Sequence, residues 1–409
     1  MGIQGTTRWS VVGVSILAGV VAAAHIGKAP PVIPVLRHDL GLGLIAAGWV
    51  VSMFNALGSV CGIVQGSIGD ALGHRRSALL GLVMLAAGGG LGAVASDQTL
   101  LLVGRCLEGV GFISVVVSCP GLILAATAPR DLRLTFGLLG VYMPTGVALA
   151  LAAAPFAEAA VGWRGLWLLL ALVCLGMMVL LGWITRHLPR NEAAHGPLNL
   201  RDIAGDLMAT LRRPGLWWLA IAFAAYTAQW SSLLVWLPSF LMETRQTDAV
   251  SAAAVTALIA AANAPGGVMG AWLLHRRVPR GALVVGANLA MGLCSIGIFS
   301  PELSDATRFV LCLLFSGLGG ILPSAVLGGT AVHASAPRQI GAANGMVIQG
   351  SNLGQLVGPL TAAALVSLTG GWDRVLWFLL AAALLGAAGG LFVERFERRL
   401  SLSIPRRSP

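Results

Sequence analysis

Four ionisable residues lie within long apolar stretches of this sequence, where a charge is expensive to bury. His25 and Lys28 fall in the first stretch, and Arg105 and Glu108 fall in the fourth. The members of each pair are three residues apart, so on a helix their side chains share one face. An ionisable group at membrane depth costs about 3 kcal/mol on insertion scales and is a candidate functional group. These residues predict a site for charged or proton-transferring chemistry.

Lys28 is the only lysine of the chain, and the residues Ala29-Pro30-Pro31 that follow it should interrupt a helix. Interrupted helices are tolerated in a membrane where they line a cavity. We expect Lys28 to bind an anionic substrate group; the alternative is a lysine that snorkels to the interface. His25 is either a second substrate ligand or a helix-packing group. Arg105 and Glu108 either couple transport to protons or only neutralise each other.

Uncharged polar and aromatic residues in other apolar stretches complete the candidate substrate site. They are Tyr142, Tyr226, Gln229, Trp230, Gln349 and Asn352. The usual alternative role for such aromatic residues is packing. One half of the chain thus offers charge, and the other offers hydrogen bonds and aromatic surface. That combination suits a small anion or carboxylate with a modest apolar part.

The composition indicates how these residues are positioned. Of 409 residues, 57% are hydrophobic and 10% are charged, whereas soluble domains carry about 25% charged residues. The net charge of +10 comes from short basic clusters between apolar stretches, which argues against a nucleic-acid partner. All six cysteines lie in apolar segments without metal-ligand spacing. They predict buried free thiols, with no metal or other cofactor.

Twelve apolar runs are long enough to cross about 30 Å of hydrocarbon as helices. The sequence therefore predicts an all-α membrane protein with twelve transmembrane helices. The longest interruption, 186–215, is predicted to be a cytoplasmic linker between six-helix bundles at 1–185 and 216–409, the second ending in a short basic cytoplasmic tail. The predicted spans are 10–34, 45–69, 77–95, 99–127, 133–157, 165–185, 216–241, 251–274, 282–300, 308–332, 341–368 and 374–393.

The distribution of arginine predicts the orientation of these spans. With the N-terminus inside, nineteen arginines fall in cytoplasmic segments and five fall outside. Cytoplasmic loops carry an excess of basic residues. We therefore expect both termini to be cytoplasmic, in a bacterial-type inner membrane.

The two halves of the chain are related by an internal repeat. A shift of 208 residues superimposes Asn55-Ala56-Leu57-Gly58 on Asn263-Ala264-Pro265-Gly266, and it also carries Gly146 onto Gly354. Near the first spans the offset is 204, which aligns Lys28 with Ser232. Two six-span halves in the same orientation are parallel repeats, with the substrate site between them near the midplane.

The loop after the second span carries a motif that names a family. Residues 66–76 read Gly-Ser-Ile-Gly-Asp-Ala-Leu-Gly-His-Arg-Arg, which resembles the signature of the major facilitator superfamily. Arg105-x-x-x-Gly109-x-Gly111 is similar to its fourth-helix motif, whose arginine is associated with proton coupling. The resemblance implies a monomeric alternating-access transporter. In it, the cytoplasmic gate residues are Gly66, Asp70, Gly73, Arg75 and Arg76.

Two further features bear on the transported substrate. The segment Gly27-Lys28-Ala29-Pro30 is similar to the first helix of the cyanate and nitroimidazole permease group, with Lys28 in place of an arginine. In the fifth span Pro144 follows Met143, so the Gly-Pro pair of the family's antiporter motif is missing. We expect a proton-coupled secondary transporter of a small organic or inorganic anion, and no enzyme. The alternatives are a proton-driven exporter of drugs or amphiphiles and, from another class, a membrane sensor or enzyme on the same scaffold.

Overall fold

The computed structural model describes residues 6–60, 62, 73–188, 200–333 and 340–403, and over these ranges the chain is helical without strands. The first half contains α1 (Trp9–Gly27), η1 (Pro30–Val32), α2 (Ile33–Leu40), α3 (Leu44–Ser52), η2 (Met53–Asn55), α5 (His74–Ala93), α6 (Gln98–Ala126), η3 (Pro129–Asp131), α7 (Leu132–Leu139), α8 (Tyr142–Ile184) and η4 (Thr185–His187). The rest contains α9 (Leu200–Leu211), α10 (Pro214–Arg245), α11 (Ala249–Ala261), α12 (Asn263–His275), α13 (Arg280–Phe299), α14 (Asp305–Gly319), α15 (Ile321–His333), α16 (Ile340–Thr369) and α17 (Val375–Ser403).

Nine helical segments of the described ranges are apolar and long enough to cross a membrane. One of them runs from Gly137 to His187 and covers most of the predicted span 133–157 and all of 165–185. Within it Gly162 adopts a φ of 71°, a left-handed conformation that glycine reaches without steric cost. This residue interrupts the helical geometry of α8 between the fifth and sixth spans.

The first predicted span is interrupted after α1, as Ala29-Pro30-Pro31 predicted, and the second changes to η2 after α3. Three further predicted spans are not continuous helices. The predicted spans 133–157, 251–274 and 308–332 are interrupted after α7, α11 and α14. A proline follows each interruption, at Pro144, Pro265 and Pro323. Proline has no backbone N–H and therefore cannot donate to the carbonyl four residues earlier, which weakens the helix there. The apolar runs predicted the crossings, but their proline positions were not used to place the breaks.

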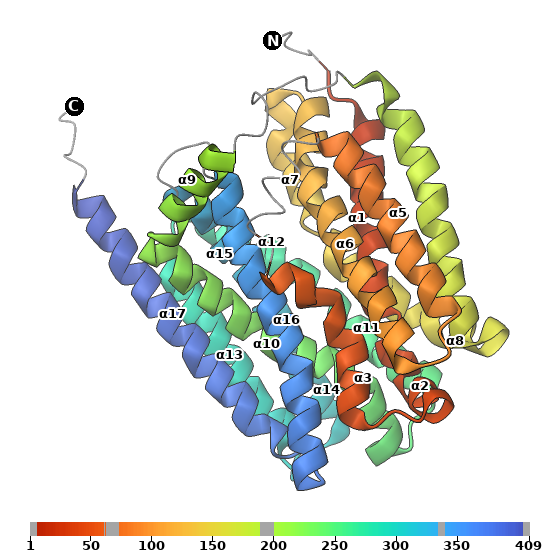
Figure 1. The fold of residues 1–409 in the computed structure, drawn as a ribbon. Helices are drawn as coiled ribbons and strands as arrows, with labels where there is room; N and C mark the ends of the chain where they lie inside the picture. The colour runs from red at the N-terminus through yellow and green to blue at the C-terminus, as the bar shows by residue number, and fades with distance from the viewer. Residues whose placement is uncertain (1–5, 61, 63–72, 189–199, 334–339, 404–409) are drawn as a thin grey trace.

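The helices form two bundles that meet at the end of the molecule away from the termini (Figure 1). In one bundle α1 packs on α8 and α6, and α5 packs on α6 and α8. In the other, α10 packs on α16 and α17, and α13 packs on α17 and α14. Contacts between the bundles join α3 with α16, α8 with α11, and η1 with α10.

Equivalent close contacts in the two bundles reproduce the internal repeat. A Cβ atom on Gly146 would collide with the carbonyl oxygen of Val20, and one on Gly354 would collide with that of Ala224. Gly354 lies 208 residues after Gly146, and Ala224 lies 204 residues after Val20. Both offsets found in the sequence therefore correspond to one repeated helix–helix contact. The two parallel six-helix repeats are confirmed.

The cysteines of the described ranges are free thiols. Four of these five are buried, but Cys106 is only half-buried, so the expectation of burial was wrong there. Cys106 follows the fully buried Arg105 by one position, which rotates its side chain about 100° away around α6. Cys61 lies outside the described residues.

Candidate functional site

Helices α1 and α6 bring the four predicted ionisable residues together in what we call the buried quartet: His25, Lys28, Arg105 and Glu108. Glu108 is at its centre. Its Oε1 accepts from Lys28 Nζ at 2.5 Å and lies 3.2 Å from His25 Nδ1. Its Oε2 accepts from Arg105 Nη1 at 2.5 Å. The side chains of Lys28, Arg105 and Glu108 have no exposed surface.

Arg105 is held by further hydrogen bonds that fix its guanidinium group. Nε donates to the carbonyl oxygen of Val50 at 3.0 Å, and Nη1 donates to that of His25 at 2.9 Å. The guanidinium carbon lies 4.7 Å from the centre of the Phe54 ring. Nη2 is buried without a hydrogen-bond partner. Arg105 is therefore a fixed cation with one donor nitrogen, Nη2, that is not hydrogen-bonded.

Two residues that the sequence analysis did not select complete the surroundings of the quartet. Lys28 Nζ lies 4.4 Å from the centre of the Trp167 ring, a cation–π distance. His25 Nε2 lies 3.2 Å from Cys174 Sγ. Both residues belong to α8, which packs along α1. No short motif marks them, because they reach the quartet through helix packing.

Glycines of α5 make room for Glu108. A Cβ atom on Gly88 would lie 2.5 Å from the carbonyl oxygen of Gly104 and 2.7 Å from Glu108 Cγ. One turn further along, Gly92 packs directly on the Trp167 ring. Small residues allow this close approach of helices in lipid. The glycine spacing in α5 therefore helps to position the carboxylate of the quartet.

The quartet places more positive than negative charge in a dry interior. With neutral His25, the ionised forms of Lys28, Arg105 and Glu108 give it a net charge of +1. Each buried ion is stabilised only when paired and hydrogen-bonded. One carboxylate here satisfies two cations at once, so the site carries one positive charge in excess.

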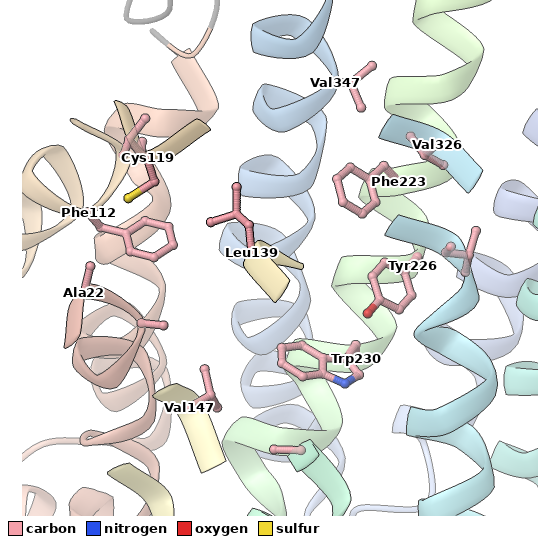
Figure 2. Close-up of a cluster of buried hydrophobic side chains, with 14 of the residues drawn as sticks. Ala22, Phe112, Cys119, Leu139, Val147, Phe223, Tyr226, Trp230, Val326 and Val347 are labelled. Carbon is pink, nitrogen blue, oxygen red and sulfur yellow. The ribbon is translucent and has the colours of Figure 1, made fainter. Parts of the chain in front are cut away.

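The equivalent region of the second bundle contains an uncharged network. Asn263 Nδ2 donates to Tyr226 Oη at 3.0 Å and to the carbonyl oxygen of Ser316 at 2.9 Å. Trp230 Nε1 donates to Ser316 Oγ at 3.0 Å. Ser316 aligns with Glu108 at the offset of 208, so hydroxyl chemistry replaces the carboxylate. Tyr226 and Trp230 follow Phe223 along α10 (Figure 2).

Gln229 belongs to the same helix. Its Nε2 donates to Asn288 Oδ1 at 3.2 Å, while its Oε1 is buried without a hydrogen-bond partner. Asn263, Asn288 and Ser316 were not selected from the sequence. The alignment of Asn263 with Asn55 and of Ser316 with Glu108 was the available signal for two of them.

The remaining predicted substrate ligands lie elsewhere. Tyr142 is half-buried and packs on Gly19, which belongs to α1. Gln349 Nε2 donates across the two bundles to the carbonyl oxygen of Val60 at 3.2 Å. Asn352 Nδ2 donates to the carbonyl oxygen of Ile348 within its own helix at 3.0 Å. The side-chain hydrogen bonds of Gln349 and Asn352 therefore do not involve the quartet.

The predicted gate is described only in part, because Gly66 and Asp70 lie outside the described residues. Gly73 has a φ of 81° and precedes α5. Arg75 donates to Thr185 Oγ1 at 3.1 Å and to the carbonyl oxygen of Gly182 at 2.9 Å, while Arg76 is exposed. These contacts of Arg75 join α5 to the end of α8, within the first bundle.

Comparison with known families identifies the fold and its general activity. The sequence profile described as Major Facilitator Superfamily matches residues 15–326. The chain belongs to this superfamily. Its members are transporters and not enzymes, so this protein moves a small molecule across a membrane. The family predicted from the sequence motifs is confirmed.

Relatives within the superfamily include transporters of different substrates. The chain is 26% identical over 408 residues to the probable sulfoacetate transporter SauU of Cupriavidus necator, covering 95% of this chain and 94% of that protein. It is 25% identical over 395 residues to the 2-nitroimidazole transporter of Escherichia coli, covering 94% and 95%. The latter supports the predicted likeness to nitroimidazole permeases.

A solved structure has the same fold. It is a bacterial homologue of the human lysosomal transporter Spinster, in an inward-facing and occupied conformation. The TM-score is 0.75 at 16% sequence identity, covering 95% of this chain and 97% of that one. The similarity confirms the superfamily fold.

Proposed function

We propose that this protein is a secondary active transporter of a small organic or inorganic anion, coupled to protons. The observation that supports this most directly is the sharing of one Glu108 carboxylate by Lys28 and Arg105. The excess positive charge lies on α1 and α6 in the interior of the first bundle, where Gly88 of α5 and Trp167 of α8 pack against the quartet. Charge-assisted hydrogen bonds to ammonium and guanidinium groups are among the strongest that an anion can receive.

Proton coupling is assigned to Glu108, with Arg105 as its partner. Glu108 is the only carboxylate of the quartet, and its charge sets how strongly Lys28 is held. Its protonation frees a cation for the substrate, so proton binding and anion binding reinforce each other. His25, within 3.2 Å of the same oxygen, is the second proton acceptor of the site.

The relatives include support for both functions that the sequence left open, an anion transporter and an exporter of drugs or amphiphiles. SauU is named as a sulfoacetate transporter and matches this chain over nearly its full length, which favours an anion. The alternative is a proton-driven exporter. It is favoured by the aromatic residues Tyr226 and Trp230 and by the puromycin resistance protein pur8 of Streptomyces alboniger, 28% identical over 205 residues. That match covers only half of this chain and 39% of pur8.

The substrate is expected to contact both bundles. Lys28 and His25 supply charge, and residues of α10 supply hydrogen bonds and aromatic surface. We further propose that Tyr142, Gln349 and Asn352 join the site in other states of the transport cycle. We assign residues 1–185 and 216–409 to two bundles that rock about this site as a monomer, in a bacterial-type inner membrane with both termini cytoplasmic. The predicted gate segment, Gly66 to Arg76, would control access from the cytoplasm.

A thermal-shift screen of the purified protein tests this proposal. The panel comprises small carboxylates, sulfonates and inorganic anions, with puromycin and 2-nitroimidazole as uncharged or cationic competitors. A ligand that binds the folded state at a hundred times its Kd stabilises it by about 2.7 kcal/mol. Stabilisation by anions alone supports the anion transporter. Stabilisation by puromycin alone, with resistance in an exporter-deficient strain, would establish the exporter instead.

A further inference from the structure

The proposed anion transport leaves open what happens to the charge of the quartet when an anion enters. Both oxygens of Glu108 are already bonded to a cation, because Oε1 accepts from Lys28 and Oε2 accepts from Arg105; Lys28 Nζ also lies 3.2 Å from His25 Nδ1. An incoming anion that contacts Lys28 therefore competes with Glu108 for this ammonium group. Arg105 is held by two backbone carbonyl groups and remains in place.

This exchange brings two anionic groups to one dry site. Lys28 Nζ is 2.5 Å from the Glu108 carboxylate, so an anion bound to Lys28 is a direct neighbour of Glu108. Where two acidic groups share a site, like-charge repulsion favours protonation of one of them. A sulfonate remains ionised under these conditions, so the proton goes to Glu108.

We propose that the substrate anion displaces the Glu108 carboxylate from Lys28, that Glu108 takes up one proton, and that the protein moves one monovalent anion with one proton. This inference rests on the proposed function. The proton comes from the solution on the side where the anion enters, and the Glu108 carboxylate releases it on the other side when its bond to Lys28 re-forms.

The net charge of the site is the same in both forms. The empty quartet carries +1 from Lys28, Arg105 and ionised Glu108. The loaded quartet carries Lys28, Arg105, neutral Glu108 and one negative charge of the anion, which is again +1. The membrane potential does work only on the net charge that crosses the membrane. One monovalent anion and one proton carry no net charge, so the potential does no work over a complete transport cycle. A divalent anion with a single proton would move one negative charge and would feel the potential.

The geometry therefore assigns the substrate class as monovalent anions with oxygen acceptors. The buried and unpartnered Nη2 of Arg105 lies on the same guanidinium group as the Nη1 that binds Glu108. It provides an additional donor for an acceptor group with several oxygens, such as a sulfonate or carboxylate. The cation–π contact with Trp167 keeps Lys28 stabilised while it changes partners.

Transport by the purified protein in liposomes tests the inference. The probes are labelled 2-hydroxyethanesulfonate and methanesulfonate, which stay ionised and do not cross the lipid as neutral acids. Potassium gradients with valinomycin set the membrane potential independently of the pH gradient. With the outside two pH units more acidic, we expect accumulation up to about 100-fold, tenfold per unit. A potential of about 120 mV of either sign should change it less than twofold.

The alternative result is equally clear. If Lys28 binds the anion while Arg105 keeps ionised Glu108, one negative charge moves per cycle. About 120 mV, positive inside, would then accumulate the probe up to about 100-fold without a pH gradient. That result would overturn the inference and leave the anion transporter standing. If neither probe is exchanged or accumulated under any gradient, the proposed function fails together with the inference.

Glu108→Gln identifies the proton acceptor. This variant should still exchange labelled for unlabelled probe, but a pH gradient should no longer accumulate it. The matched control is Glu302→Gln, the same chemical change at an exposed position, which should retain accumulation. Glu108→Asp keeps a carboxylate and should recover part of the response to the pH gradient. A persistent full response in Glu108→Gln assigns the proton elsewhere and overturns the inference, while the wild-type potential measurement remains decisive if the variant does not fold.

Discussion

The Nζ atom of Lys28 lies 2.5 Å from Oε1 of Glu108, although the two residues are 80 positions apart in the chain. This ion pair links α1 to α6 and leaves neither side chain exposed. A lysine that snorkels to the interface would keep its ammonium group in water. The structure therefore excludes snorkelling for Lys28 in this conformation.

Replacement of Lys28 tests its contact with an anion. Lys28→Ala should weaken binding of the stabilising anion by about 10–150-fold, the equivalent of losing about 1.5–3 kcal/mol from a charge-assisted bond. Lys28→Arg should retain part of the affinity with altered selectivity, because a planar fork replaces a compact ammonium group. Affinity is measured by titration of monodisperse protein, so that misfolding is not counted as lost binding.

The control for Lys28 is Ser232→Ala, at the position aligned by the repeat. Ser232 Oγ donates to the carbonyl oxygen of Ala228 within its own helix, so its loss should leave anion affinity within about threefold. Wild-type affinity in well-folded Lys28→Ala protein would contradict the anion site and favour the exporter.

The glycines of α5 provide a test of how tightly Glu108 is held. Gly88→Ala introduces a Cβ atom 2.5 Å from the Gly104 carbonyl oxygen, so α5 and α6 must separate. Such overpacking costs about 1–3 kcal/mol. We expect a lower melting temperature and slower transport.

Gly90→Ala is the matched substitution on the same helix, where a Cβ atom meets nothing within 4 Å. It should be neutral or stabilising by up to about 1 kcal/mol, because alanine favours helix over glycine. Equal melting temperatures for the two variants would show that α5 and α6 approach each other less closely than in this structure.

An ion pair between the two bundles predicts how often α2 and α10 separate. Arg37 Nη1 lies 3.1 Å from Glu243 Oε1, joining α2 to the end of α10 on the side where the bundles meet. Both side chains are partly exposed, so the pair contributes at most about 1 kcal/mol, or roughly a fivefold change in the ratio of two states. Arg37→Glu should increase the population in which α2 and α10 separate. Spin-label distances between the two helices measure this.

Exchange of both charges, Arg37→Glu with Glu243→Arg, should restore the wild-type distances. As a control, Arg245→Gln removes a pair with Asp305 that joins helices of the second bundle only, and it should leave the distance between bundles unchanged. If Arg37→Glu leaves the distance distribution unchanged, the ion pair of Arg37 with Glu243 does not stabilise the contact between α2 and α10.

The arginine distribution predicts the topology. A reporter fused after Pro409 should be cytoplasmic, and one inserted near Asp305, between α13 and α14, should be external. The physical reason is the nineteen-to-five excess of arginine on one side. Activity of paired reporters, one active only inside and one only outside, measures this. An external C-terminus would contradict the proposed orientation, although the helix packing would stand.

The membrane class, the internal repeat and the main ionisable residues follow from the amino-acid sequence alone. Twelve apolar runs, with so few charges, cannot fold around a soluble core, and the two offsets of 208 and 204 reappear as equivalent contacts at Gly146 and Gly354. His25 with Lys28, and Arg105 with Glu108, were recognisable because ionisable groups are rare within apolar spans. Helical spacing placed each pair on one face.

Which residues meet between helices depends on how the helices pack in three dimensions. Periodicity specifies the face of a helix but not the rotation and height at which two helices pack, so the sharing of Glu108 by Lys28 and Arg105 could not be derived. Trp167 and Cys174 reach the quartet from α8 for the same reason. Asn352 and Gln349 were both predicted substrate ligands three positions apart, yet Asn352 bonds within α16 while Gln349 reaches the other bundle. Apolar side chains in lipid do little to fix the rotation and height of one helix against another. In this protein those are fixed by close packing at glycines and by buried polar groups that need hydrogen-bond partners.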